Sequence, residues 1–284
     1  MKIGITGATG QLGNLVVAKL KEKTAAENLV ALVRTPEKAG NLGIEVRMFD
    51  YNQPSGLSEA LKGIDILFLI SGSEIGKRAE QHQNVINAAK EAGIKRIVYT
   101  SLLHADRSTL VLAPEHLATE TAIKASGLTY TILRNGWYTE NYTASIPAAL
   151  QAGTFTGSAG DGKIASASRS DFADAAVAVL TGPGHDGKIY ELAGDEYYTL
   201  TDFAAVLSEI TGKNIPYQNL QEADYTSALI QAGLPEPLAA AFASFDASAA
   251  KGDLYDSGKQ LSQLTGHSTM TLADAIKKAL AGYK

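Results

Sequence analysis

The sequence contains no cysteine among its 284 residues. This absence excludes disulfide bonds, zinc sites built on thiolates, iron–sulfur clusters and a cysteine nucleophile. A chain without disulfides fits a reducing compartment, so we expect a cytoplasmic protein. No set of His, Asp and Glu shows the spacing of a metal site, and the sequence therefore predicts no bound metal.

Positive charge and long apolar runs are also scarce. Lys and Arg number 25 against 30 Asp and Glu, a formal net charge of −5, and such a chain lacks the basic surface of a general nucleic-acid binder. The longest charge-free run, residues 141–160, carries many polar residues, whereas a membrane span needs about 20 predominantly apolar ones. Glycines interrupt the apolar residues of the N-terminus, which is unlike a signal peptide. We therefore expect neither a membrane span nor a signal peptide.

The first 134 residues alternate between short β-branched runs and helix-like stretches. The expected strands are Lys2–Thr6, Leu29–Arg34, Ile44–Met48, Ile64–Ser71, Arg96–Ser101 and Thr129–Arg134. The expected helices are Gln11–Lys23, Ser55–Leu61, Ala79–Ala92 and Glu115–Ser126. Gly63, Gly93 and Gly127 each stand just before a strand, where a left-handed residue can end a helix. This alternation predicts an α/β fold with a doubly wound parallel sheet of the Rossmann type.

The pattern changes after Arg134. Residues 135–169 are rich in Gly, Ser and Thr, and the remainder is rich in Ala. Further elements are expected at Asp171–Leu180 (capped by Ser170 or Asp171), Lys188–Leu192, Thr201–Thr211 and Ile215–Asn219, with Pro235 and Pro237 separating two C-terminal helices. We expect a nucleotide-binding Rossmann domain at residues 1–134, completed by 170–193. A smaller α/β substrate-binding region should comprise residues 135–169 and 194–284.

The segment Thr6–Gly13 follows the first expected strand and opens the first expected helix. A dinucleotide-binding loop must turn tightly, bring backbone N–H groups against a diphosphate and pack the helix on the strand. Its three glycines suit these tasks, although G-x-x-G-x-x-G differs from the standard G-x-G-x-x-G. The loop residues expected at the cofactor are Gly7, Thr9, Gly10, Gln11, Leu12 and Gly13. The alternative is a glycine-rich turn without a ligand, but the surrounding strand and helix favour binding.

The end of the second strand bears on the type of nucleotide. Arg34 stands 21 residues after Gly13, where an NAD site usually has an acidic residue for the ribose 2′-hydroxyl. A guanidinium there can bind the 2′-phosphate of NADP. A solvated arginine is the alternative, and the nearby Glu37 also keeps NAD open; we expect NADPH. Asp50 follows the third strand, where it can accept from the adenine amino group and Tyr51 can cover the ring. The alternative is a turn in which Asp50 caps a helix.

Polar residues end the next two strands, where ligands of open α/β sheets bind. Ser71, Gly72 and Ser73 can contact the ribose and the diphosphate. Thr100 and Ser101 can line the nicotinamide pocket. Each set can instead form an ordinary strand-end turn.

Three segments are distinctive: GATGQLG at residues 7–13, ALVR at 31–34 and YTILRNGWYTENY at 130–142. They resemble the NmrA-like branch of the atypical short-chain dehydrogenases. Within that family, SLLHAD at 101–106, RNGWY at 134–138 and GDGKIASA at 160–167 are most similar to bacterial NAD(P)H-dependent quinone reductases. Triarylmethane dye reductases are similar as well. The likeness runs the full length of the chain.

The resemblance implies a flavin-free, NADPH-dependent reductase with the cofactor in the N-terminal domain and the substrate between the domains. It places one group of residues at the nicotinamide end: Asn135, Gly136, Tyr138, Thr139, Glu140 and Asn141. Trp137 and Tyr142 could stack on a planar ring, with inter-domain packing as the alternative. Arg169 and Lys163 can reach cofactor or substrate, or are solvated surface charges.

The proton-transfer pair of ordinary short-chain dehydrogenases, Tyr-x-x-x-Lys, is missing from the expected helix Glu115–Ser126. The spacing occurs once, at Tyr255–Lys259, far along the chain and with a glycine inside it, which we take as coincidence. Counting back from Thr131 to the position where relatives keep a lysine leads to His116. His116 and Tyr138 are therefore the catalytic candidates. Quinones and cationic triarylmethane dyes accept hydride with little or no proton donation, so a site without the pair suits them.

The sequence thus predicts an NADPH-dependent quinone oxidoreductase that transfers two electrons directly, as hydride, to a small-molecule quinone. Two alternatives stay open: an NADP(H)-binding redox sensor with little turnover, and a triarylmethane dye reductase. The aromatic residues Trp137, Tyr138 and Tyr142 favour catalysis over sensing. We expect a monomer or a homodimer that binds neither nucleic acid nor a membrane.

Overall fold

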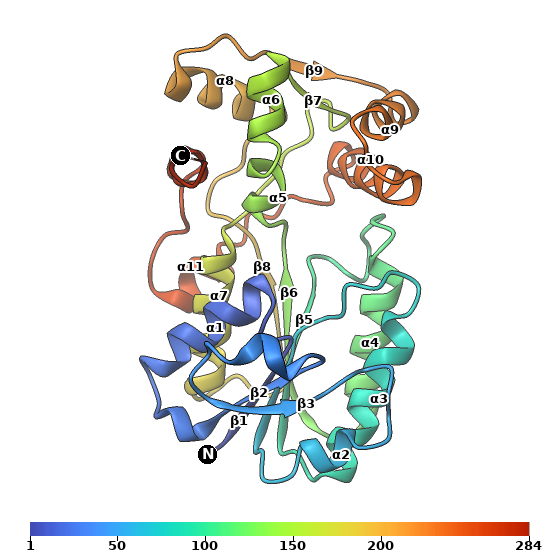
Figure 1. Cartoon of the computed structure of the whole chain (residues 1–284), viewed down its shortest axis with the longest axis vertical. Coiled ribbons are helices and arrows are strands. Elements are labelled where there is room, and N and C mark those ends of the chain that lie inside the picture. The colour runs from blue at the N-terminus through green and yellow to red at the C-terminus, as the bar shows by residue number, and fades with distance from the viewer. Residues whose placement is uncertain (284) are drawn as a thin grey trace. The chain divides into compact units, whose positions relative to one another are not determined.

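The computed structural model describes residues 1–283 and contains a seven-stranded sheet of order β3-β2-β1-β4-β5-β6-β8 (Figure 1). The strands are β1 (Ile3–Thr6), β2 (Leu29–Val33), β3 (Glu45–Met48), β4 (Ile66–Leu69), β5 (Arg96–Leu102), β6 (Thr129–Asn135) and β8 (Lys188–Leu192). Neighbours from β3 through β6 pair in parallel. The order reverses between β1 and β4, as in doubly wound sheets, and the predicted α/β fold class is confirmed.

Helices cover both faces of this sheet (Figure 1). On one face lie α1 (Gln11–Lys21) and α7 (Arg169–Thr181), and on the other α2 (Leu57–Ala60), α3 (Arg78–Glu91) and α4 (Ala113–Ala125). Two short 3₁₀ turns, Ala26–Asn28 and Pro36–Ala39, flank β2. Every residue of β1, β2 and β4 is buried, which explains their continuous apolar runs. Gly63, Gly93 and Gly127 have φ values of 75°, 73° and 80°, so their predicted left-handed conformation is confirmed.

The chain divides into two compact units. The first comprises Met1–Asp106, Leu112–Asn135 and Arg169–Glu191. The second comprises Arg107–Val111, Gly136–Ser168 and the chain from Leu192 onward. The sheet and its five helices thus belong to the first unit, apart from the last residue of β8.

The second unit is mainly helical. Its elements are α5 (Thr139–Thr143), α6 (Ile146–Ala152), β7 (Phe155–Gly157), α8 (Leu200–Thr211), β9 (Tyr217–Asn219), α9 (Glu222–Gln231), α10 (Glu236–Ala250), α11 (Gln260–Thr265) and α12 (Leu272–Ala281). β7 and β9 form a parallel pair. The ring of Phe203 on α8 lies 4.6 Å from that of Phe155 in the core of this unit. α8 begins with a capping box. The Thr199 hydroxyl accepts from the Asp202 N–H, and the Asp202 carboxylate accepts from the Thr199 N–H, so both backbone groups have a partner.

The predicted elements occur with ends shifted by a few residues, and one detail is wrong. α7 begins at Arg169, so Ser170 and Asp171 lie inside its first turn and neither is the cap. The sequence predicts a later start, because its pattern of apolar residues marks the buried face of a helix and not its ends.

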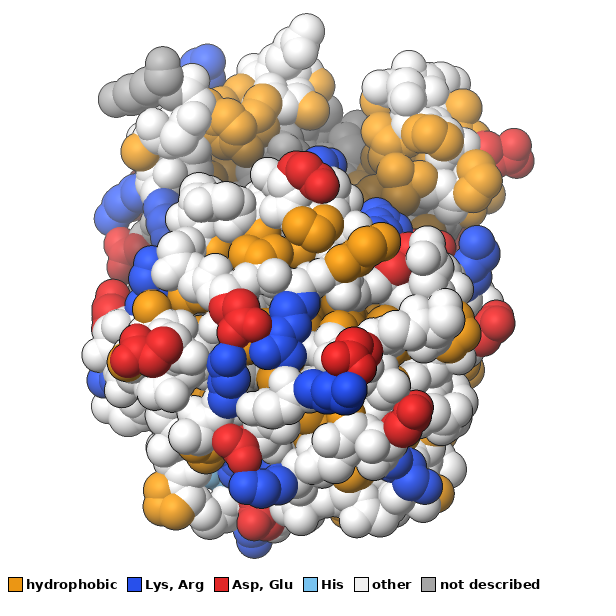
Figure 2. Space-filling view, turned by 60° about the horizontal axis from the view of Figure 1, so that its bottom comes forward, with side chains coloured by type: hydrophobic (Ala, Val, Ile, Leu, Met, Phe, Trp, Pro, Cys, Tyr) orange, Lys and Arg blue, Asp and Glu red, His pale blue; other side chains and the backbone are white. Residues whose placement is uncertain are grey.

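No helix among residues 1–283 is long and apolar enough to cross a membrane. Over the same residues, no group of three His, Cys, Asp or Glu side chains could hold a metal ion. On the face shown in Figure 2, acidic and basic side chains are interspersed rather than gathered by sign. This distribution agrees with the small net charge of −5.

Candidate functional site

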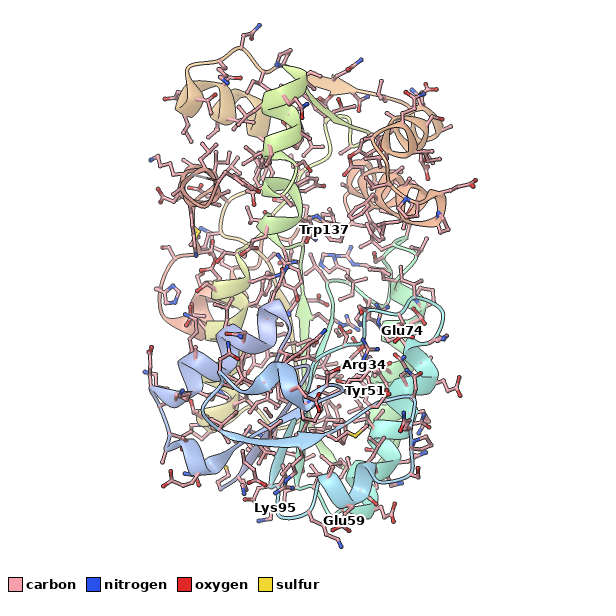
Figure 3. All side chains as sticks on the ribbon, viewed as in Figure 1. Arg34, Tyr51, Glu59, Glu74, Lys95 and Trp137 are labelled. Atoms are coloured by element: carbon pink, nitrogen blue, oxygen red, sulfur yellow. The ribbon has the colours of Figure 1, made fainter. Side chains whose placement is uncertain are left out.

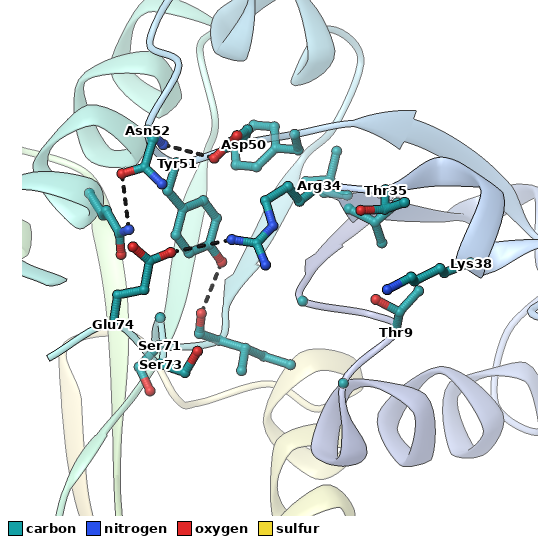
Figure 4. Close-up of a pocket in the computed structure, with 18 residues that line it drawn as sticks. Thr9, Arg34, Thr35, Lys38, Asp50, Tyr51, Asn52, Ser71, Ser73 and Glu74 are labelled. Carbon is teal, nitrogen blue, oxygen red and sulfur yellow. Dashed lines mark hydrogen bonds and ion pairs between the residues drawn. The ribbon is translucent and has the colours of Figure 1, made fainter. Parts of the chain in front are cut away.

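A pocket of about 380 Å³ opens beside the carboxyl ends of β1, β2 and β4 (Figure 4). Its size falls in the range of small-molecule sites. Four short segments of the first unit line it: Gly7, Thr9 and Gly10 after β1; Leu32–Thr35 and Lys38 around the end of β2; Phe49–Asn52 after β3; and Ile70–Glu74 with Gln81 after β4. Eight predicted cofactor residues therefore meet in one cavity: Gly7, Thr9, Gly10, Arg34, Asp50, Ser71, Gly72 and Ser73.

The loop between β1 and α1 is shaped by its glycines. Gly7 has a φ of 58°, a left-handed conformation that suits glycine, and its N–H donates to the Leu32 carbonyl at 3.1 Å. A Cβ at Gly13 would overlap the Gly7 carbonyl oxygen and lie 2.8 Å from Ala8 Cα. Gly13 thus lets α1 approach the loop, although it lines no part of the pocket.

The first turn of α1 is suited to an anion. Gly10 precedes the helix without a side-chain cap, and the first turn has no acidic residue. The first N–H groups of a helix lack intrahelical partners and carry the positive end of its dipole. A diphosphate is the group that such a loop and helix start accept. Gln11 and Leu12 lie in this turn, outside the pocket lining.

The far end of the pocket carries charged and aromatic groups. The Arg34 side chain is 68% exposed, and its Nη1 lies 3.3 Å from Glu74 Oε1. Asp50 accepts from the Asn52 N–H at 3.0 Å and so lies in a turn, but it caps no helix, because the N-cap of the next helix, α2, is Gly56. Tyr51 donates its hydroxyl to the Ile70 carbonyl at 2.9 Å, and burial raises its pKa. Lys38, Glu74 and Gln81 also line the pocket, although no motif in the sequence predicts a role for them.

Buried polar side chains hold the wall after β4 in place. The Ser71 N–H donates to Thr100 Oγ1 at 2.9 Å, and the Gly72 N–H donates to His82 Nε2 at 2.9 Å. Burial, with the nearby Arg78, lowers the His82 pKa to about 3, so the ring is neutral. Because Nε2 accepts from the Gly72 N–H, the single ring proton lies on Nδ1, beside Thr119 Oγ1. Thr100 therefore supports the pocket from behind rather than lining it.

A buried charge cluster occupies the carboxyl ends of β5 and β6. Arg134 binds Glu120 through two hydrogen bonds of 2.8 and 2.9 Å, and it also binds Glu191 at 2.7 Å. Ser101 donates its hydroxyl to Glu120 at 2.7 Å. Burial would raise the pKa of Glu120, but the hydrogen bonds from Arg134 and Ser101 outweigh it and hold this pKa below the ordinary value. No spacing along the sequence predicts this cluster, because its members come from one helix, α4, and three strands, β5, β6 and β8.

His116, on α4, is only 5% exposed. Its Nδ1 lies 2.7 Å from the Tyr99 hydroxyl. Burial, with smaller contributions from Arg78 and His82, lowers its pKa well below the ordinary 6.5. The imidazole is therefore neutral at physiological pH, a state typical of a packed histidine rather than of a charged proton donor.

Comparison with known families and structures identifies the chain. The model of the NAD(P)H-binding family matches residues 7–183, more than half of the 284 residues. The chain belongs to this NmrA-like, NAD(P)H-binding family. The resemblance predicted from its motifs is confirmed, and the glycine loop lies at the start of the matched region.

Members of known activity match nearly the whole chain. It is 56% identical to quinone oxidoreductase 2 of Escherichia coli (strain K12) over 96% of this chain and 97% of that protein. A crystal structure of the NADPH-dependent quinone oxidoreductase of Escherichia coli with NADPH has a TM-score of 0.96 and 55% identity, covering 98% of this chain and 99% of that one. Citrobacter sp. triphenylmethane reductase with NADP(H) has a TM-score of 0.95 and 38% identity, covering 98% and 100%.

The residues predicted at the nicotinamide end lie outside the pocket lining. Most belong to the second unit: Gly136, Tyr138, Thr139, Glu140 and Asn141. There the Gly136 N–H donates to the Leu192 carbonyl at 2.7 Å, and the hydroxyls of Thr139 and Ser166 are 2.7 Å apart. The ring of Trp137 packs edge-on against Phe245 at 5.2 Å. Asn135, which ends β6, and Arg169, which begins α7, belong to the first unit.

Proposed function

We propose that this protein is an NADPH-dependent quinone oxidoreductase that transfers hydride directly, without a flavin. The observation that carries the proposal is a glycine-loop dinucleotide pocket with Arg34 and Lys38 at its edge, in a chain 56% identical over nearly its full length to a quinone oxidoreductase. When bound, the nicotinamide supplies a hydride from its C4. A quinone that takes up this hydride and one proton becomes a hydroquinone.

The pocket fits the cofactor by the chemistry of its groups. We assign the diphosphate to the loop of Gly7, Gly10 and Gly13, in which a Cβ at Gly13 would collide with the backbone of Gly7 and Ala8. Arg34 and Lys38 are the cationic groups available for a 2′-phosphate, because a guanidinium binds phosphate through two parallel hydrogen bonds. We assign the ribose and diphosphate oxygens to Ser71–Ser73 as well.

The nicotinamide end and the substrate remain assignments from the sequence. We propose that Asn135, Gly136, Tyr138, Thr139 and neighbouring residues serve the nicotinamide, and that residues 135–169 and 194–284 bind the substrate. We also propose a cytoplasmic monomer or homodimer whose partner is a small-molecule quinone.

His116 has a supporting role in this proposal. Its imidazole is buried and neutral, and a quinone needs little help from a proton donor. His116→Ala should therefore reduce turnover by less than about tenfold, whereas a general acid contributes roughly 10²–10⁴-fold. A larger loss of kcat with unchanged quinone affinity would assign the proton to His116 instead.

The direct test follows NADPH oxidation by absorbance with benzoquinone, a long-chain quinone and a triarylmethane dye in parallel. Stereospecifically deuterated NADPH should give a kinetic isotope effect from one face of C4 only, without a semiquinone signal by electron spin resonance. Gly13→Ala should abolish binding and turnover together, because the added Cβ overlaps the Gly7 carbonyl. Tight NADPH binding with no quinone-dependent oxidation would favour the sensor, and a preference for the dye would favour a dye reductase.

A further inference from the structure

Glu74 lies across the pocket from Arg34 and is bound to it. Arg34 Nη1 and Glu74 Oε1 are 3.3 Å apart, and the contact joins the end of β2 to the segment after β4 (Figure 4). Both side chains line the cavity. Lys77 approaches the other carboxylate oxygen of Glu74 at 3.7 Å. The guanidinium that the cofactor needs is therefore already partnered by a carboxylate of the same pocket.

The backbone around Glu74 is braced rather than loose. Before it, the Gly72 carbonyl accepts from Arg78 Nε at 2.8 Å. After it, the N–H groups of Gly76 and Arg78 both donate to Glu115 Oε1 at 3.0 Å. Arg78 and Glu115 are themselves an ion pair with side chains only 6% and 16% exposed. Hydrogen bonds before and after Glu74 therefore hold the backbone of its segment in place in the pocket wall.

The contact between Arg34 and Glu74 affects the binding of one group of the cofactor, the 2′-phosphate of NADPH. A phosphate monoester on Arg34 would take the place of the Glu74 carboxylate, because each group presents two anionic oxygens to the same edge of a guanidinium. The two anions would also repel each other at this distance. A ribose 2′-hydroxyl has no such conflict, since it can donate to the carboxylate. Glu74 therefore acts against NADPH and leaves NADH unaffected or slightly favoured.

We propose that Glu74 is a specificity-determining residue that competes with the 2′-phosphate for Arg34 and so narrows the preference for NADPH over NADH. This inference rests on the proposed use of NADPH. It concerns binding alone, so it can be tested without a quinone.

The test measures calorimetric dissociation constants of Glu74→Gln and of the unmodified protein. The probes are adenosine 2′,5′-bisphosphate and AMP, which differ only in the 2′-phosphate and carry no nicotinamide, followed by NADPH and NADH. Glu74→Gln should bind the 2′-phosphorylated probes roughly three- to fivefold more tightly, the factor that matches the loss of an exposed charge contact. Its affinity for AMP and NADH should stay the same or fall. Added salt should shrink the gain, because it screens exposed charges.

Two control experiments test whether the contact between Glu74 and Arg34 causes the gain in affinity. Glu59→Gln changes the net charge equally and removes a glutamate with a lysine three residues later, Lys62, but Glu59 lies far from the pocket (Figure 3). It should leave all four constants unchanged. In an Arg34→Ala background, Glu74→Gln should have no effect on the 2′-phosphorylated probes.

Equal shifts for AMP and the bisphosphate, no shift, or a gain that persists without Arg34 would each overturn the proposal. A selective gain for the bisphosphate in a protein that does not reduce quinones would support the inference while the proposed function fails.

Discussion

Two arginine–glutamate pairs in the first unit have the same chemistry and opposite surroundings. Arg34 and Glu74 touch through one contact of 3.3 Å, with side chains 68% and 37% exposed. Arg134 and Glu120 share two hydrogen bonds of 2.8 and 2.9 Å, with side chains 6% and 0% exposed. From this comparison we infer that solvent access, rather than residue type, decides whether a ligand can replace one partner of a pair.

The two pairs differ because of what can replace the glutamate once it leaves the arginine. If Glu74 leaves Arg34, water or a phosphate can take its place, so the exposed pair is weak and open to competition. If Glu120 leaves Arg134, the guanidinium loses two hydrogen bonds at a site where its side chain is only 6% exposed, so water replaces them poorly. The buried cluster has further partners, because Ser101 donates to Glu120, and both Glu191 and Asp106 bind Arg134. It therefore supports the strand ends as a structural unit.

The largest expected effect breaks the buried pair. Glu120→Ala should lower the free energy of unfolding by about 3–5 kcal/mol, because it leaves Arg134 partly unpaired in the interior. Urea denaturation followed by circular dichroism measures it, with Glu120→Gln as the variant that keeps the shape and removes the charge. A loss below about 1 kcal/mol would mean that Glu191 and Asp106 together satisfy Arg134 without Glu120.

A buried carboxylate without an arginine sharpens the comparison. Asp246 is 5% exposed, and its partners are the Tyr142 hydroxyl at 3.1 Å and the Ser158 N–H at 2.9 Å. Burial raises its pKa from 3.8 to about 6. The folded state therefore holds this proton more tightly, so its contribution to stability is complete below pH 3.8 and is lost as the pH rises to about 6.

Asp246→Asn should remove this pH dependence, which amounts to about 3 kcal/mol at 1.36 kcal/mol per pH unit. The measurement is the difference in unfolding free energy between the variant and the unmodified protein at pH 4 and at pH 7. That difference should shift in favour of the variant at pH 7. Glu120, whose pKa is lowered, should show the opposite sign and stabilise the fold less as the pH falls below its ordinary value of 4.5. A constant difference across the range would contradict the assignment.

The next effect concerns the exposed arginine. Arg34→Asp should weaken NADPH binding by about 1.5–3 kcal/mol, roughly ten- to a hundredfold, and spare or improve NADH. Calorimetry with both cofactors measures the change. Lys95→Asp is the control, because Lys95 is also exposed and paired with a carboxylate, Asp65, but lies far from the pocket (Figure 3). Equal affinities for NADPH and NADH in the unmodified protein would remove the role of Arg34.

The smallest effect completes the comparison. Glu74→Ala should change the unfolding free energy by less than about 1 kcal/mol, since an exposed pair contributes little to folding. The measurement is the same urea titration that is used for Glu120→Ala. A loss as large as that of Glu120→Ala would show that exposure does not separate the two pairs.

Much of the cofactor loop could be predicted because its determinants are local. The turn at Gly7, the close approach at Gly13 and the start of α1 all depend on residues within one stretch of chain. Arg34 was predictable from its distance along the chain, since a βαβ unit of ordinary length brings the end of the second strand beside the loop. The start of α7 could not be predicted, because the apolar period does not mark the ends of a helix.

The partners of these residues were decided by the tertiary structure. Ser101 lies beside Arg134 because β5 and β6 pair in parallel in that register, and a shift of one residue would place the two side chains on opposite faces of the sheet. Glu74 reaches Arg34 across 40 positions of sequence because Arg78, His82 and Glu115 hold its segment over the pocket. By itself, the sequence determined the elements and the glycine loop, since periodicity and backbone freedom act over a few residues. Only the packing of distant elements decided which charges would be buried together and which would meet at the pocket, because burial and register depend on the whole chain.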